Sequence, residues 1–365
     1  MPAPHLTTHP TDPDPHPTTR RHGDPYTTAQ VPESAVLALL TGTPAATAAA
    51  RVPVPIADLI DAAERYQTAG RAALTTPTDH AWYQANIEFP DPPTAEHTAV
   101  TALGPHLRHA ETAGILHTWW YIRKTPYWRL RLHTDRRHQH QLRAFVTRLL
   151  DGLASHGSIT GWSAGVYEPE THAFGGHAAM AVAHRFFHAD STHILTYLHH
   201  RHTRRQQQAP TLGPRELSLL LCGTLLRAAD QDWHEQGDIW HRVTAMRPLH
   251  PDHHDPRRFP QITAKVHHTL TLDPRQTVTH TADRDLTGQV DPWLTATHDT
   301  GAALTRLART GALRRGLRDI LAHHLVFHWN RLGLTTTAQS VLAHAAATAT
   351  LDTTDPPRTA PRADP

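Results

Sequence analysis

The amino-acid sequence predicts an α+β fold: an antiparallel sheet packed with helices, followed by a largely helical C-terminal subdomain and preceded by a small helical module. Two observations support this class. Apolar and polar residues alternate in three short segments, at residues 82–89, 119–133 and 162–168, as they do in half-buried strands. After Ser191, nearly every segment instead repeats its apolar residues at helical spacing.

The two ends of the chain and the segment before the main domain differ in character. Residues 1–31 and 352–365 are rich in proline and threonine, so we expect both to be disordered tails. Residues 33–75 form a small helical module whose short helices, joined near Gly42 and Pro53–Pro55, resemble a helix-turn-helix. DNA binding normally needs a basic face, whereas this module has three arginines against four acidic residues, a net charge of −1. We therefore expect a docking or structural role and no direct DNA binding.

The main domain is expected to span residues 82–351. Its first elements are a strand at 82–89, a helix at 95–110, a hairpin of strands 119–123 and 127–133 turning near Pro126, and a helix at 142–153 that stops at Gly157. The hairpin, together with the order of consecutive strands, indicates an antiparallel sheet.

The last strand, at residues 162–168, is expected to end at Pro169, which lacks an N–H for the ladder. Gly175–Gly176 permits backbone angles closed to other residues and lets another segment approach closely. From His177 the pattern is helical as far as Asp190–Ser191, which we expect to cap a following helix. Further helices are expected at 217–226, 293–310, 313–331 and 337–351, with a proline- and histidine-rich loop at 247–260.

Composition excludes several classes of protein. Lysine and arginine total 35 against 33 acidic residues in a chain of 365, which argues against a general polyanion binder. The single cysteine, Cys222, excludes an internal disulfide and lies in an apolar run typical of a core. No segment approaches the roughly 18 apolar residues of a membrane helix, and the N-terminus lacks the apolar core of a signal peptide. We expect a cytoplasmic protein without membrane contact.

Three separated motifs follow one another in a distinctive order. The aromatic run Trp119–Arg123 precedes the strand segment Arg129–Arg131. Residues 161–191 then combine an aromatic strand, an acidic turn, a Gly-Gly break and a helix that reaches an Asp-Ser pair, and Asn330–Leu332 follows near the C-terminus. Over roughly residues 82–334, the chain resembles the C-terminal elimination domain of lantibiotic dehydratases, which also occurs as free-standing thiopeptide-type bacteriocin biosynthesis proteins.

The resemblance implies a lyase that acts on a ribosomally made precursor peptide. In that family a separate domain glutamylates serine and threonine using glutamyl-tRNA, and this domain eliminates glutamate to leave dehydroalanine or dehydrobutyrine. Arg129 and Arg131 share one face of their strand about 7 Å apart, and paired guanidiniums suit a carboxylate or a developing anion. The resemblance implies that both are catalytic, with Arg123 binding substrate beside them if the hairpin register allows. The alternative is a solvated face of an edge strand.

Two departures from the family pattern bear on this assignment. Family members often carry an Arg-Tyr pair before the Gly-Gly break, where this chain has Ala173 and Phe174. We expect His172 to substitute partly for that arginine, as a substrate contact together with Glu170. Family members also tend to carry a histidine four residues before the asparagine of the last motif, where this chain has Val326.

His324 and His328 flank that position and are the candidate bases. They are four residues apart and share a helical face, a spacing that suits a general base or a metal. No acidic third ligand accompanies them, so we expect no metal site. Asn330 and Arg331 match the family and are expected to bind substrate. The remaining histidines, of 34 in all, are scattered and are ascribed to biased composition.

Three functions remain open. The first is the elimination lyase, which requires a separate glutamylating protein because no glutamylation domain fits within this length. The second is a thiopeptide macrocyclase that joins two dehydroalanines in a formal (4+2) cycloaddition, and Ala173 and Val326 count toward it. The third is a non-catalytic protein that delivers the peptide, with the helical module as its dock. All three bind a ribosomal precursor peptide, and no cofactor motif occurs.

Overall fold

The computed structural model describes residues 31–75, 82–207, 212–253, 255–279 and 284–352. The tails expected at residues 1–31 and 352–365 lie almost wholly outside this part of the chain. Two compact units, Met1–Asp79 and His80–Pro365, divide the chain. No helix in the described segments has the length and apolar character needed to cross a membrane.

The described part of the first unit consists of three helices: α1 (Glu33–Leu40), α2 (Ala45–Ala49) and α3 (Ile56–Thr75). Val36, Ala48, Leu59 and Ala63 are buried between them and form a small apolar core. Burial of apolar area is what holds such short helices together, because isolated helices of this length are marginal in water. These helices occupy the segment that the sequence predicted as a helical module.

The second unit is built on a four-stranded antiparallel sheet with the order β2-β3-β1-β4. The strands are β1 (Trp82–Glu88), β2 (Thr118–Lys124), β3 (Tyr127–His133) and β4 (Gly161–Gly165). The predicted hairpin is confirmed, because β2 and β3 pair from end to end and the chain turns through Thr125–Pro126. The predicted class is confirmed as α+β, since helices make up nearly all the rest of this unit.

The last strand is shorter than predicted. β4 ends at Gly165, so Val166, which is 84% exposed, and the residues after it leave the sheet. The reason lies with Tyr167, whose ring turns back over the sheet and packs against Trp82 and Trp120. Burial of this aromatic side chain outweighs the ladder bonds that a longer edge strand would gain.

Helices cover one face of the sheet closely. They are α4 (Pro92–Thr98), a π-helical turn (Ala99–Leu103), α5 (Gly104–Thr112) and α6 (Gln139–Ser155). Apolar residues of α5 and α6, such as Leu107 and Val146, are buried in one core with Trp119 and Leu130 of the sheet. Gly157, with a φ of +70°, ends the turn after α6 as expected.

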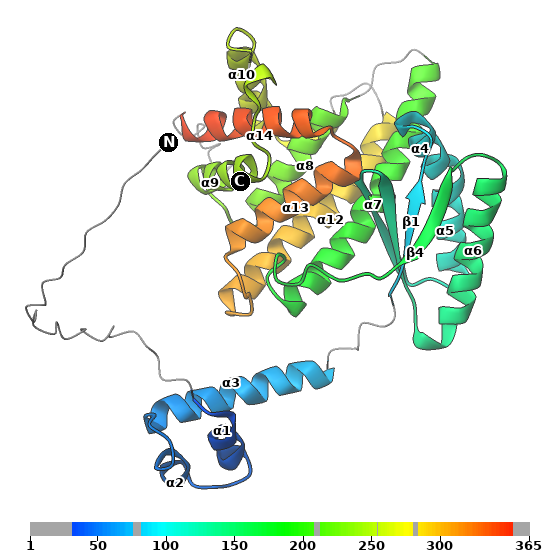
Figure 1. The fold of residues 1–365 in the computed structure, drawn as a ribbon. Coiled ribbons are helices and arrows are strands. Elements are labelled where there is room, and N and C mark those ends of the chain that lie inside the picture. Colours follow the sequence, from blue (N-terminus) through cyan, green and yellow to red (C-terminus); the bar gives the residue numbers. More distant parts are fainter. Residues whose placement is uncertain (1–30, 76–81, 208–211, 254, 280–283, 353–365) are drawn as a thin grey trace, which may run out of the picture. The chain divides into compact units, whose positions relative to one another are not determined.

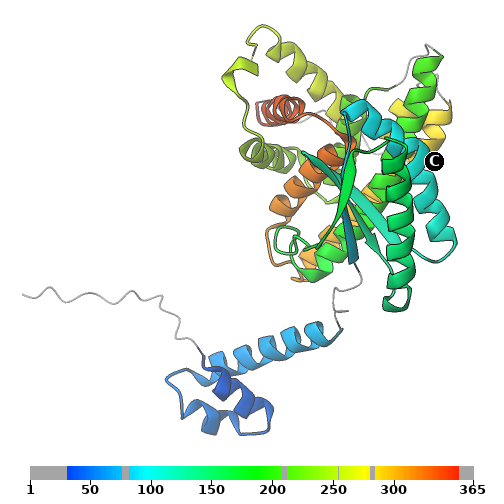
Figure 2. The same ribbon diagram turned by 45° about the vertical axis from the view of Figure 1, so that its right-hand side comes forward.

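The remaining helices lie beside the sheet, next to its outer strand β2, against which α7 and α13 pack (Figures 1 and 2). They are α7 (His177–Gln206), α8 (Pro214–Ala228), α9 (Trp233–Met246), α10 (Phe259–Thr271), α11 (Pro274–Thr279), α12 (Arg284–Arg309), α13 (Leu317–Leu332) and α14 (Thr336–Leu351). The loop expected at residues 247–260 is confirmed for the described residues before Phe259, where α10 already begins, and it contains a short 3₁₀ turn, Pro251–His253. Helices α8, α9, α13 and α14 share a second apolar core centred on Trp240 and Trp329.

Helix α7 is a single helix of 30 residues, so the cap expected at Asp190–Ser191 is wrong. Both side chains are fully buried in the middle of the helix. A short polar side chain favours a cap when the backbone donors are free, but here each finds a tertiary partner instead. Neighbouring residues on a helix point about 100° apart, and the two side chains therefore serve different parts of the fold.

Asp190 joins three helices. Its carboxylate accepts hydrogen bonds from Trp293 Nε1 of α12 at 2.8 Å, from His328 Nδ1 of α13 at 2.9 Å and from Arg331 Nε of α13 at 2.6 Å. Burial alone would raise the pKa of Asp190, but His328 and Arg331 outweigh it and hold the pKa at about 2. Because the ionised carboxylate can only accept, Nδ1 of His328 carries a proton.

Ser191 and His188 of α7 make hydrogen bonds to the backbone of the outer strand β2. The Oγ of Ser191 accepts from the backbone N–H of Tyr121 on β2 at 3.3 Å. One turn earlier, Nδ1 of His188 lies 2.9 Å from the carbonyl oxygen of Trp119. The outer strand β2 is therefore covered by α7, which removes an unpaired edge from solvent.

We predict that Asp190→Asn lowers the free energy of unfolding by about 3–5 kcal/mol, because it leaves the Arg331 guanidinium buried without a counter-charge. Urea unfolding followed by circular dichroism measures the change. Asp151→Asn is the control: Asp151 is an exposed residue of α6 that also accepts a tryptophan N–H, at 2.9 Å. Equal stability of the two variants would contradict a role for the buried carboxylate.

Candidate functional site

A row of polar side chains crosses the face of the sheet that α5 and α6 leave free. The antiparallel register places Arg131 of β3 opposite Gln84 of β1, and Asn86 of β1 opposite Ser163 of β4. Gln84 Oε1 accepts from Arg131 Nε at 2.9 Å, and Gln84 Nε2 donates to Asn86 Oδ1 at 3.1 Å. Gly165 leaves room for this row, since a Cβ there would lie 3.0 Å from both amide nitrogens.

Arg131 is the most tightly held member of the row. Its side chain is only 4% exposed, and its guanidinium lies between the rings of Trp120 and Tyr167, 4.2 and 4.4 Å from their centroids. Nη2 lies 3.9 Å from Glu170 Oε1, whereas Nη1 is buried and has no hydrogen-bond partner within the described residues. Burial lowers the pKa of Arg131, and Glu170 opposes that shift. The aromatic clamp fixes the cation and leaves one donor edge for a further acceptor.

Arg129 lies on the same face and is more accessible. The register places it between Ile122 of β2 and Asn86 of β1. Its side chain is half-buried and makes no hydrogen bond or ion pair with any residue that the structure describes. Residues that are two positions apart on a strand lie about 7 Å from each other. Arg129 and Arg131 therefore share one face, as the sequence predicted. One is fixed by its neighbours and the other is free to bind an anion.

A tyrosine–histidine pair adjoins the arginines, and the sequence analysis missed it. The hydroxyl of Tyr167 lies 2.7 Å from His184 Nε2 of α7. Burial, then His133 and Arg131, lower the pKa of His184 to about 4, so the imidazole is neutral at pH 7. Tyr167 belongs to the motif noted in the sequence, but only the departure of the chain from β4 reveals its partner. A neutral imidazole bonded to a phenol is a group that can accept or return a proton.

His324 and His328 lie in the interior and not at the sheet face. They share one face of α13 as predicted, yet their exposed fractions are 0% and 3%. His328 is bound to Asp190, and His324 packs against Phe174 and Phe186. Burial, and then Arg331 and His323, lower the pKa of His324 to about 3. Neither side chain reaches a surface that a peptide could contact in this conformation.

Arg331, expected to bind substrate, is also fully buried. Its Nε donates to Asp190, and its guanidinium lies 4.4 Å from the centroid of Phe187. This ion pair therefore belongs to the interior of the fold, where breaking it is costly.

Arg123 does not join Arg129 and Arg131, because the register pairs it with Trp128 and so turns it to the opposite face. Its Nε donates to the carbonyl oxygen of Arg331 at 2.9 Å, and its Nη1 donates to Glu96 at 2.7 Å. A cation at the end of α13 suits the helix dipole there. The expectation that Arg123 lies beside Arg129 and Arg131 is therefore wrong. Arg123 instead links β2 to the end of α13.

Arg123 and Asn330 instead line a cavity of about 520 Å³ beside the turn of the hairpin. Asn330 Oδ1 accepts from Gln339 Nε2 at 3.0 Å. The cavity is bounded by the β2–β3 turn and by the connection between α13 and α14. The expected substrate contacts are thus divided between this cavity and the sheet face.

The Gly-Gly break behaves as the sequence predicted. Gly175 and Gly176 have φ angles of +86° and +101°, and a Cβ on either would collide with Ile320 or Arg314. The break lets the start of α13 approach the segment 166–176. His172 on this segment is exposed, whereas Phe174 is fully buried. The residue next to the break, Phe174, is therefore part of the apolar interior.

The buried imidazoles give a testable dependence on pH. Because His184 and His324 have folded-state pKa values of about 4 and about 3, against about 6.5 when unfolded, the unfolded chain binds protons that the folded chain does not. We predict that the free energy of unfolding falls as pH is lowered from about 6.5 to about 4. His324→Phe should reduce this slope, measured by urea unfolding at each pH, whereas exposed His298→Gln should not. An unchanged slope in His324→Phe would show that folding does not lower the pKa of this imidazole.

Comparison with known proteins places this chain in a family. The family model described as "Lantibiotic biosynthesis dehydratase C-term" matches residues 82–350. The structure of the tRNA-dependent lantibiotic dehydratase MibB from Microbispora sp. 107891 is similar, with a TM-score of 0.56 and 18% identity over 76% of this chain. This chain covers 28% of MibB, so it corresponds to part of that longer protein.

A second similar structure is that of the pyridine synthase TbtD from thiomuracin biosynthesis, with a TM-score of 0.50 and 14% identity. The match covers 75% of this chain and 98% of TbtD. At these identities the two likenesses establish the fold. A search of curated proteins finds no match. The family model, which spans most of the chain, shows that this protein belongs to the lantibiotic dehydratase C-terminal domain family.

Proposed function

We propose that this chain modifies a ribosomally made precursor peptide by eliminating glutamate from glutamylated serine or threonine, leaving dehydroalanine or dehydrobutyrine. The arrangement of Arg129 and Arg131 on the sheet face, beside Tyr167–His184, carries this proposal. Elimination removes the α-hydrogen of the modified residue and expels a carboxylate. It therefore needs a proton acceptor and positive charge close together.

The two arginines suit different parts of this reaction. Arg129 has no competing partner in the described chain, so its guanidinium is available to bind the departing glutamate carboxylate. Arg131, held between two rings with Nη1 unpaired, suits the developing enolate oxygen because its position is fixed before the reaction. An arginine stays charged even where burial lowers its pKa.

The Tyr167–His184 pair is the proposed proton acceptor. In this proposal the proton passes through the phenol to the neutral imidazole of His184. Glu170, half-buried at 3.9 Å from Arg131, lies at the rim of the same cluster and orients the guanidinium. His328 and Arg331 act as positioning residues, since they hold α13 through Asp190, and His324 does so by packing against Phe174 and Phe186.

We predict that Arg129→Ala lowers the rate of glutamate elimination roughly a hundredfold or more, because one stabilising cation is lost. Mass spectrometry of a glutamylated precursor peptide measures the loss of the glutamyl group and the appearance of a dehydrated residue. Arg148→Ala, an exposed arginine of α6 on the covered side of the sheet, is the control and should keep full activity. If Arg129→Ala matches the control, the arginine pair has no part in the reaction.

We also predict that Tyr167→Phe slows elimination by about two orders of magnitude, the usual contribution of a general acid or base. The phenylalanine ring preserves the packing over Arg131 and removes the hydroxyl that bonds His184. The thermal midpoint should change little, which separates a chemical effect from a structural one. Full activity in Tyr167→Phe would place the base elsewhere.

A separate glutamylating protein is the proposed partner. The chain alone should leave an unmodified precursor peptide unchanged and act only after that peptide has been glutamylated. Addition of the glutamylating protein and its glutamyl-tRNA should restore dehydration. Dehydration by the isolated chain of an unmodified peptide would contradict this division of labour.

Pyridine synthesis is the second candidate, and a specific observation favours it. Ala173 and the buried Val326 stand at the positions where elimination domains often carry an arginine and a histidine. A synthase would join two dehydroalanines in a formal (4+2) cycloaddition and would need no glutamyl leaving group. Two results together would favour the synthase over the lyase. The glutamyl ester would survive in the elimination assay, and a predehydrated peptide would be cyclised. Binding without either reaction would favour a delivery role.

A further inference from the structure

His117, Asp135 and His138 meet at the end of the sheet opposite the hairpin turn, separate from the proposed active site. His117 directly precedes β2, and its backbone N–H donates to the carbonyl oxygen of His133 at 2.9 Å. Asp135 begins the turn that follows β3, and His138 ends it. Residues three apart on a 3₁₀ turn eclipse one another, so Asp135 and His138 project to the same side.

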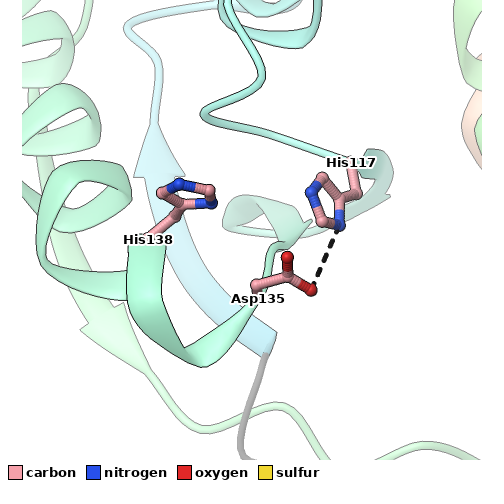
Figure 3. Close-up of side chains that lie close together, drawn as sticks. All are labelled: His117, Asp135 and His138. Carbon is pink, nitrogen blue, oxygen red and sulfur yellow. Dashed lines mark ion pairs between the residues drawn. The ribbon is translucent and has the colours of Figure 1, made fainter.

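The donor atoms of these three side chains all lie within 4.8 Å of one another. His117 Nδ1 lies 3.7 Å from Asp135 Oδ1, and Figure 3 shows all three side chains turned toward a common space. Nδ1 of His138 is buried and has no hydrogen-bond partner in the described chain. A buried imidazole nitrogen without a partner is costly, and a bound cation would satisfy it.

The backbone and one neighbour hold this arrangement in place. Thr134, fully buried, donates its hydroxyl to the carbonyl oxygen of Ile115 at 2.8 Å, which ties the two segments together. Arg137 Nη2 donates to Asp135 Oδ2 at 3.1 Å and leaves Oδ1 facing His117. An outer hydrogen bond of this kind commonly orients a metal-binding carboxylate.

We propose that His117, Asp135 and His138 bind one divalent transition-metal ion of the zinc class. Two imidazoles and a carboxylate match the ligands of Zn²⁺, with water as a fourth ligand, whereas Ca²⁺ and Mg²⁺ prefer oxygen alone. Zinc bonds of about 2.0–2.2 Å require the donor atoms to close by roughly 1 Å, a movement that side-chain rotation supplies. The ion joins the start of β2 to the start of α6, and this site departs from the sequence expectation of no metal.

The test is the stoichiometry of Zn²⁺ binding to the full, tag-free chain by isothermal titration calorimetry. The tight phase is the part of the titration with the highest affinity for Zn²⁺. In that phase Asp135→Asn and His138→Gln should each bind one equivalent of Zn²⁺ fewer than wild type. His298→Gln is the matched control, because His298 is exposed and lies 3.4 Å from Asp299 without a third ligand. It should match wild type, and Zn²⁺ should raise the thermal midpoint of wild type and control more than that of the two variants.

Equal tight-phase stoichiometry in all four proteins overturns the site, and so does a loss in His298→Gln as large as in the other two. Circular dichroism establishes that each variant is folded. If one site variant does not fold, the other and His117→Gln decide the result. The readout is metal binding, so the outcome is independent of whether the chain proves to be a lyase or a synthase.

Discussion

The fully buried carboxylate of Asp190 is the contact on which the arrangement of the helices and the sheet depends. It lies in the middle of α7 and receives hydrogen bonds from Trp293 of α12 and from His328 and Arg331 of α13. Burying a charge is costly unless it is paired and hydrogen-bonded, so α7, α12 and α13 have one favourable arrangement. Ser191, the next residue, bonds the edge of β2 and so ties the same helix to the sheet.

This constraint also shapes the proposed site. Arg331 offers its carbonyl oxygen to Arg123 of β2, so the ion pair in the helical layer is linked directly to the hairpin that carries Arg129 and Arg131. The Gly-Gly break brings the segment 166–176 against the start of α13, and that segment places Tyr167 over Arg131. A rigid support matters because electrostatic stabilisation of an anion requires donors that are already in position.

Local pattern in the sequence was sufficient for the strands, the hairpin and the shared face of Arg129 and Arg131, since all follow from alternation with period two. Local pattern failed where a residue distant in the sequence determines the structure. Asp190–Ser191 has the composition of a cap, but residues more than 100 positions later hold the carboxylate inside a continuous helix. The face of Arg123 depends on the length of the hairpin turn, which fixes the register. His184 was inconspicuous among 34 histidines until the fold placed it beside Tyr167.

The central claim is that the precursor peptide binds beside the polar row of Arg129 and Arg131, on the sheet face that α5 and α6 leave free, and not another surface. Amide hydrogen exchange, followed by mass spectrometry with and without glutamylated peptide, tests it most directly. The account predicts slower exchange in β4 and in the segment 166–176, with no change along α8, α10 and α14. Those three helices line a largely apolar cavity of about 580 Å³, which is the competing surface. Protection confined to these helices, with residues 161–176 unchanged, would contradict the account.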